Sequence, residues 1–91
     1  ASANVQNCFS TQGCVIEGTV KNSILGTNCT VAKDAKVIDT VLMPGAKVSQ
    51  GASVTRCIVA GDVEIGPGVT VGSKNSEHIE LVAKNLYKEG D

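Results

Sequence analysis

Aromatic side chains are almost absent from this sequence. Its 91 residues include no tryptophan, one tyrosine and one phenylalanine, so aromatic residues make up only 2% of the chain. A wide hydrophobic core is usually filled with such rings, because each one buries a large apolar area. The composition therefore favours a fold with a narrow interior.

Histidine is equally scarce, and its scarcity excludes one class of enzyme. His78 is the single histidine of the chain, whereas a zinc hydratase site needs three histidines around its metal. His78 could act as the general base of an acyltransferase, although a solvated or locally bonded histidine is the more common case. We expect no catalytic, cofactor-binding or metal-binding residue in this segment.

Neither the charge distribution nor the length of the apolar runs indicates a nucleic-acid or membrane partner. The net charge is −1 and both signs are interspersed, so the basic patch of a nucleic-acid-binding surface is missing. No apolar run approaches twenty residues, and no signal peptide is recognisable. We therefore expect a cytoplasmic protein that binds neither nucleic acid nor membranes.

The four cysteines, Cys8, Cys14, Cys29 and Cys57, show no C-x-x-C spacing. Cys14 and Cys29 occupy equivalent positions of neighbouring repeats, which makes a disulfide or a metal site conceivable. Ala46 and Val63 follow at the same position in later repeats, and a thiol is a good small apolar filler. We interpret all four cysteines as structural thiols.

Glycine, asparagine and aspartate recur at one position of a six-residue unit. Each stands three residues after the apolar or small residue that opens its unit, and these residue types tolerate a backbone with positive φ. A chain that needs such a residue at the same point of every unit turns the same corner repeatedly. The predicted corner residues are Gly13, Asn28, Asp34, Gly45, Gly51, Asp62, Gly68 and Asn85.

The units combine into a longer period of seventeen residues. Leu25, Leu42 and Val59 stand seventeen apart, and the same interval separates Val31 from Val48. Each period consists of five plus six plus six residues, a pattern typical of hexapeptide β-helices. The sequence thus predicts an all-β fold, a single-stranded left-handed parallel β-helix of hexapeptide repeats with about five coils.

Both ends of the single domain, residues 1–91, are less regular than its centre. Regular coils are expected over about residues 5–72, the first of them two residues short between Ile16 and Thr19. Residues 73–91 form an irregular end, either a last coil or a short capping helix. We prefer a coil, because residues 82–86 resemble residues 31–35 three periods earlier, which places Val82 in the column of Val48.

Two stretches carry a resemblance to a known family. Residues 13–20 read GCVIEGTV, and residues 37–72 read VIDTVLMPGAKVSQGASVTRCIVAGDVEIGPGVTVG. Both resemble the C-terminal β-helix of glucose-1-phosphate adenylyltransferases, also called ADP-glucose pyrophosphorylases. The resemblance extends over residues 5–87 and implies that this chain is a fragment of a longer protein.

The resemblance also implies a division of labour. Enzymes of that family make ADP-glucose and pyrophosphate from ATP and glucose 1-phosphate for glycogen or starch synthesis, with the ATP and Mg²⁺ sites in an N-terminal nucleotidyltransferase domain. Their β-helix supports oligomerisation and allosteric regulation. By this resemblance the chain is not catalytic in isolation, needs no cofactor of its own, and has the N-terminal domain and other subunits of a homo- or hetero-oligomer as partners.

Several alternatives stay open at the level of the sequence. The parent protein is either a catalytic subunit or a non-catalytic regulatory homologue, because their β-helices are similar. A hexapeptide-repeat acyltransferase would be a different class of function and would depend on His78. A purely structural scaffold module would need neither an active site nor an enzymatic domain.

Overall fold

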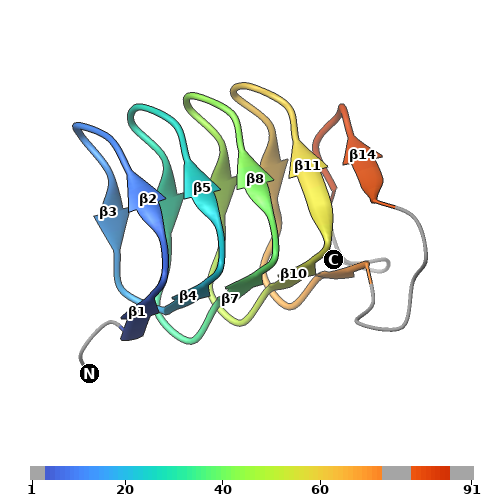
Figure 1. Cartoon of the computed structure of the whole chain (residues 1–91). Helices are drawn as coiled ribbons and strands as arrows, with labels where there is room; N and C mark the ends of the chain where they lie inside the picture. The colour runs from blue at the N-terminus through green and yellow to red at the C-terminus, as the bar shows by residue number, and fades with distance from the viewer. Residues whose placement is uncertain (1–3, 73–78, 87–91) are drawn as a thin grey trace.

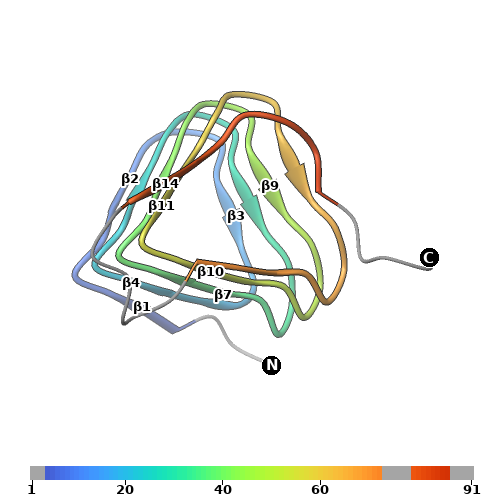
Figure 2. The same cartoon turned by 90° about the vertical axis from the view of Figure 1, so that its right-hand side faces the viewer.

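The computed structural model describes residues 4–72 and 79–86, which form strands, turns and bends but no helix. The chain winds through three short strands per coil, and Figure 2, which looks along the winding axis, shows a roughly triangular outline. Every pairing between strands is parallel and joins one coil to the next. The predicted left-handed parallel β-helix of hexapeptide repeats is confirmed.

Three parallel sheets form the sides of the triangle. The first contains β1 (Asn4–Gln6), β4 (Thr19–Lys21), β7 (Lys36–Ile38), β10 (Ser53–Thr55) and β13 (Thr70–Val71). The second contains β2 (Phe9–Ser10), β5 (Ile24–Leu25), β8 (Val41–Leu42), β11 (Cys57–Val59) and β14 (Glu80–Val82), and it faces the viewer in Figure 1. The third contains β3 (Val15–Ile16), β6 (Thr30–Val31), β9 (Lys47–Val48) and β12 (Glu64–Ile65).

The core consists of apolar columns that run along the axis. Val20, Val37 and Val54 lie in register in the first sheet and are fully buried. Leu25 pairs with Leu42 in the second sheet, and Val31 pairs with Val48 in the third. Because side chains alternate across a strand, each short strand points an apolar residue inward and its neighbours outward. This explains how a chain almost without aromatic residues closes a core.

The first coil is two residues short, as predicted. Val5 pairs with Val20 and Ile16 with Val31, a spacing of fifteen, whereas Thr19 pairs with Lys36, a spacing of seventeen. The missing residues are those of a corner between Ile16 and Thr19. Gly18 closes this shortened corner: it is buried, and a Cβ there would collide with the carbonyl oxygen of Ala35 and lie 2.6 Å from that of Ala32.

The last coil is a strand-containing coil, but the predicted register is wrong. Val82 pairs with Val59, and Leu86 forms a bridge with Ile65. Val82 therefore continues the second sheet and does not continue the column of Val48. The seventeen-residue period cannot hold here, because twenty-three residues separate Val59 from Val82 and the extra length falls within residues 72–79. Residues 73–78 lie outside the described part.

Candidate functional site

The predicted corner residues occupy a left-handed backbone conformation, with one exception. Positive φ angles between 59° and 82° occur at Gly13, Asn28, Asp34, Gly45, Gly51, Asp62 and Gly68. Asn85 is described but is not among the residues with positive φ, so its assignment as a corner is wrong. Its side-chain oxygen instead accepts a hydrogen bond from the Glu64 backbone N–H at 2.8 Å, a contact that follows from the shifted register of the last coil.

At two of these corners, a side chain of the next coil occupies the space beside the glycine. A Cβ at Gly13 would collide with Oδ1 of Asn28, and a Cβ at Gly45 would collide with Oδ1 of Asp62. Gly51 differs, because a Cβ there would meet nothing closer than the Gly68 nitrogen at 3.9 Å. Position 45 thus requires glycine both for its backbone conformation and for lack of space for a side chain. Position 51 requires glycine for its backbone conformation alone.

The structure has a further corner that the hexapeptide pattern does not predict. It lies between the first and second sheets and has positive φ at Asn7, Asn22, Asp39 and Arg56, here called the polar corner. Its residues stand fifteen or seventeen apart, so the period was a usable signal. The five-residue unit hid it, because the corner residue comes two positions after the unit-opening valine and not three.

The residue that follows each member of the polar corner carries a hydrogen-bond donor. The side chains of Cys8, Ser23, Thr40 and Cys57 donate to the carbonyl oxygens of Gln6, Lys21, Ile38 and Thr55, at 2.8–3.1 Å. Each bond spans one corner residue. The carbonyls of Gln6, Lys21 and Ile38 also accept the backbone N–H of the corner residue in the next coil, at 3.0 Å. Ser23 also accepts a hydrogen bond from the Thr40 backbone N–H at 3.1 Å. Cys8 and Cys57 are therefore structural thiols that donate hydrogen bonds in addition to filling space.

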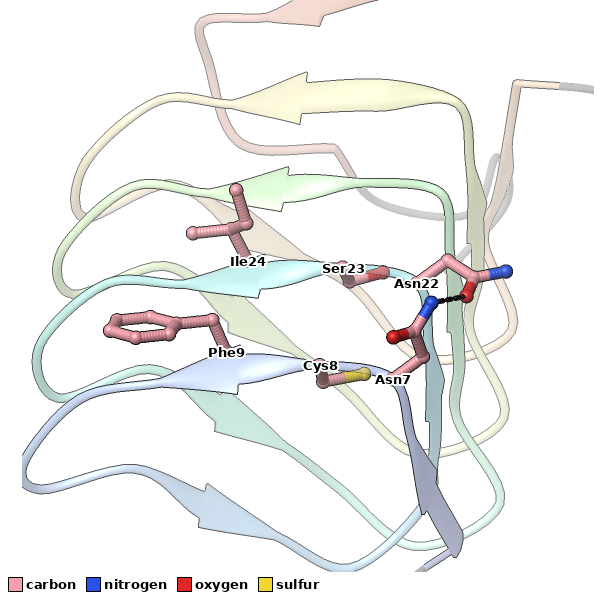
Figure 3. A pocket seen from close by; sticks show the side chains of 6 residues that line it. All are labelled: Asn7, Cys8, Phe9, Asn22, Ser23 and Ile24. Atoms are coloured by element: carbon pink, nitrogen blue, oxygen red, sulfur yellow. Dashed lines mark hydrogen bonds between the residues drawn. The ribbon is translucent and has the colours of Figure 1, made fainter.

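A hollow of the described surface lies beside the polar corner. Figure 3 shows its lining, which comes from equivalent positions of the first two coils: Asn7, Cys8, Phe9, Asn22, Ser23 and Ile24. Asn7 donates a hydrogen bond to the Asn22 side-chain oxygen at 2.7 Å. The two exposed apolar side chains, Phe9 and Ile24, lie on neighbouring strands and leave the hollow open to solvent.

This hollow contains hydrogen-bonding and apolar groups suited to binding a ligand, and no evident acid–base pair. Its polar groups are two side-chain amides, a hydroxyl and a thiol, and the hydroxyl and thiol donate to backbone carbonyls. A general acid or base needs a titratable side chain within reach of the substrate, and the lining contains no carboxylate, imidazole or amine. A second, smaller hollow lies over the last coil and is lined by residues 80–84 and Leu86.

The remaining two thiols lie one coil apart, and Cys14 is half-buried while Cys29 is buried. All four cysteines are free, so the alternative of a disulfide between Cys14 and Cys29 is not realised. Cys14 donates to the Gly26 carbonyl at 3.1 Å and Cys29 to the Met43 carbonyl at 3.2 Å. Burial raises the pKa of the Cys29 thiol and, likewise, the pKa of the Cys57 thiol. Both therefore stay protonated and unreactive at neutral pH.

Residues 4–72 and 79–86 contain no group of three or more His, Cys, Asp or Glu side chains arranged to hold a metal ion. The same residues include no helix long and apolar enough to cross a membrane. His78, the candidate base of the acyltransferase hypothesis, lies outside the described residues.

Comparison with known proteins gives consistent matches. The family model described as GlmU-like, C-terminal hexapeptide matches residues 1–84. The chain is 39% identical over 83 residues to glucose-1-phosphate adenylyltransferases of Bacillus thuringiensis (strain Al Hakam), Bacillus mycoides (strain KBAB4) and Bacillus anthracis. Each match covers 90% of this chain and 22% of the relative, so the chain spans about a fifth of the length of these proteins.

Proposed function

Because this chain belongs to the GlmU-like C-terminal hexapeptide family, we propose that it is the C-terminal β-helix of a glucose-1-phosphate adenylyltransferase, where it serves oligomerisation and regulation. The observation that carries the proposal is the 39% identity over 90% of the chain to enzymes of that name. The match takes up 22% of their length, which leaves ample sequence for a separate nucleotidyltransferase domain.

The chemistry of the described surface agrees with a non-catalytic role for this segment. The hollow beside the polar corner is lined by amides, a hydroxyl, a thiol and two apolar side chains, which bind partners more readily than they transfer a nucleotidyl group. In this proposal ATP, Mg²⁺ and glucose 1-phosphate are bound by the N-terminal domain of the parent chain. The pathway is glycogen biosynthesis, and the four free thiols support a cytoplasmic location.

The test is an activity assay on the protein encoded by the complete reading frame that contains this segment. Pyrophosphate release from ATP, Mg²⁺ and glucose 1-phosphate is measured for that protein, for a truncation that lacks residues 4–86, and for the 91-residue chain alone. We expect activity from the complete protein, altered subunit assembly or effector response in the truncation, and none from the chain alone.

The assay also separates the two kinds of parent protein. A complete protein that is inactive alone but changes the rate of a catalytic homologue identifies a regulatory subunit. Acetyl-CoA consumption that disappears in His78→Ala would instead establish the acyltransferase. A complete protein with neither adenylyltransferase activity nor influence on such an enzyme would contradict the proposal.

A further inference from the structure

One of the three sheets presents an apolar row to solvent. The outward residues of the second sheet are Phe9, Ile24, Val41, Ile58 and Leu81, here called the apolar ladder. Phe9 and Leu81 are 66% exposed and Ile24 is 52% exposed, while the other two are half-buried. The strands that carry them lie side by side across the front of Figure 1, so the row runs the whole length of the coil stack.

The other two sheets do not share this character. The first sheet has two outward rows, which contain a single apolar residue, Ile38. One row is Asn4, Thr19, Lys36, Ser53 and Thr70, and the other is Gln6, Lys21, Ile38 and Thr55. The outward row of the third sheet contains Thr30, Lys47 and Glu64 after a single apolar residue, Val15. Scattered apolar residues are normal on protein surfaces, but a contiguous apolar row bordered by polar groups is a mark of an interface.

Charges beside the apolar ladder indicate what covers it. Asp39 and Arg56 are neighbours in the polar corner, one coil apart, and this corner borders the apolar ladder along its length. A second copy placed face to face and antiparallel, with its two-fold axis between the third and fourth coils, brings Asp39 of each copy opposite Arg56 of the other. The two contacts are equivalent, as a closed two-fold interface requires.

The same placement matches four of the five residues of the apolar ladder. Val41 of one copy then faces Ile58 of the other, and Ile24 faces Leu81, while Phe9 of the first coil lies beyond the end of the other copy. Apolar burial supplies the affinity, and the reciprocal charge pairs select the antiparallel orientation.

The size of the face sets the expected strength. Four strands of each copy overlap in this placement, and at a spacing of about 4.8 Å they give a shared row roughly 14 Å long. With its bordering columns, such a face buries less than about 1,000 Å² over both copies, which is the size of weak, transient interfaces. Self-association in the micromolar range is therefore expected.

We propose that the second sheet is the surface through which two copies of this chain associate, antiparallel, along the apolar ladder. This inference deepens the oligomerisation role of the proposed function by naming its face and orientation. It concerns contacts between β-helices and requires no activity from the parent protein.

The test is sedimentation velocity of the 91-residue chain from about 5 to 500 μM, together with circular dichroism to establish that each variant is folded. We expect a monomer–dimer equilibrium that Ile24→Lys weakens at least tenfold. Val15→Lys is the matched control, because Val15 is also 52% exposed and outward but lies on the third sheet. It is expected to leave the equilibrium unchanged.

Charge exchange tests the orientation. Asp39→Arg and Arg56→Asp should each weaken association several-fold, and the double variant should recover most of the loss. Both exchanges suit the backbone, because Asp39 and Arg56 occupy equivalent corner positions with positive φ, one coil apart.

Three results would overturn the inference: a folded wild-type chain that stays monomeric at every concentration, equal effects of Ile24→Lys and Val15→Lys, or a double charge variant that recovers nothing. A monomeric chain whose apolar ladder is shielded in the complete protein would assign the face to another domain. Pyrophosphate release by the complete protein would still support the adenylyltransferase assignment in each of these cases.

Discussion

At the scale of single residues, the corners show two separate reasons for glycine. At Gly51 only the backbone conformation demands it, with φ of 74° and open space where a side chain would begin. At Gly45, with φ of 82°, the side chain of Asp62 from the next coil already occupies that space. Gly13 has the same relation to Asn28. This column therefore alternates glycine with an Asx residue that lies over it.

Alanine substitutions should separate these two requirements. Gly51→Ala is expected to cost about 1–2 kcal/mol of unfolding free energy through the left-handed backbone alone. Gly45→Ala should cost clearly more, because its Cβ collides with Asp62, and adding Asp62→Gly should recover the difference. Urea denaturation measures all three effects. Equal losses at the two glycines would show that the coil above does not constrain position 45.

The buried thiols predict a loss of stability at alkaline pH. Burial raises the pKa of Cys29 and the pKa of Cys57 above the ordinary value of 9.0. Above that pH the unfolded chain loses the thiol protons while the folded chain keeps them, so the unfolding free energy falls as pH rises, by at most about 1.4 kcal/mol per pH unit for each thiol.

A double variant isolates this effect from other groups that titrate in the same range. Cys29→Ala with Cys57→Thr uses the residues of the same columns one coil away, Ala46 and Thr40. Its stability should decline less steeply between about pH 9 and 11 than that of the wild type, as measured by urea denaturation at each pH. Parallel curves for the two proteins would argue against thiol burial as the cause.

At the scale of the strands and their connections, a row of small donors supports the polar corner. Cys8, Ser23, Thr40 and Cys57 each donate to the carbonyl two residues earlier. These bonds add to the backbone pairing between coils, in which the N–H groups of Asn22, Asp39 and Arg56 donate to the carbonyls of Gln6, Lys21 and Ile38 at 3.0 Å. Each strand of the second sheet except the last has one of these donors at or just before its first residue. In the last strand, β14, Glu80 takes this position and pairs with Cys57.

Thr40→Val should test the contribution of this row. Thr40 is 1% exposed, and its hydroxyl donates to the Ile38 carbonyl at 2.8 Å. Valine has the same shape but removes this hydrogen bond, so the Ile38 carbonyl keeps only the bond from the Arg56 backbone N–H, and we expect a loss of about 0.5–1.5 kcal/mol in unfolding free energy. Thr40→Ser keeps the donor and should cost less. A valine variant as stable as the serine variant would contradict the proposed role of the hydroxyl.

At the scale of the whole molecule, each coil contacts only the coils before and after it. The stability of such a stack is close to a sum over coils and their interfaces. A defect in the centre therefore divides the stack, whereas a defect at an end removes one coil. The first and last coils are the irregular ones here, one shortened and one lengthened.

Buried carboxylates placed at the centre and at the end should have different effects. Val48→Asp introduces an unpaired charge at a site that is 1% exposed in the third coil, and we expect it to unfold the chain. Val82→Asp does the same in the last coil and should leave the preceding coils folded. Amide hydrogen exchange should then show lost protection near Val82 and retained protection near Val37. Global unfolding by Val82→Asp would show that the last coil is required for the whole stack.

Much of the fold could be predicted from residue types alone. The inward columns, the seventeen-residue period and the shortened first coil all follow from local spacing, because a stacked coil repeats its own pattern. The polar corner was missed because its residues fall outside the six-residue unit, and Arg56 is not a residue type associated with positive φ. The register of the last coil was missed because similarity to residues 31–35 suggested a period that the longer connection does not keep.

The sequence by itself determined a narrow three-sided stack of short strands, since only small corner residues and periodic apolar positions satisfy that geometry. Tertiary structure decided which outward residues share a face. Phe9, Ile24, Val41, Ile58 and Leu81 stand at intervals of fifteen, seventeen and twenty-three residues, and only strand pairing brings them into one row. Their common exposure is a property of the neighbouring coils, so no single coil carries the apolar surface that the assembled stack presents.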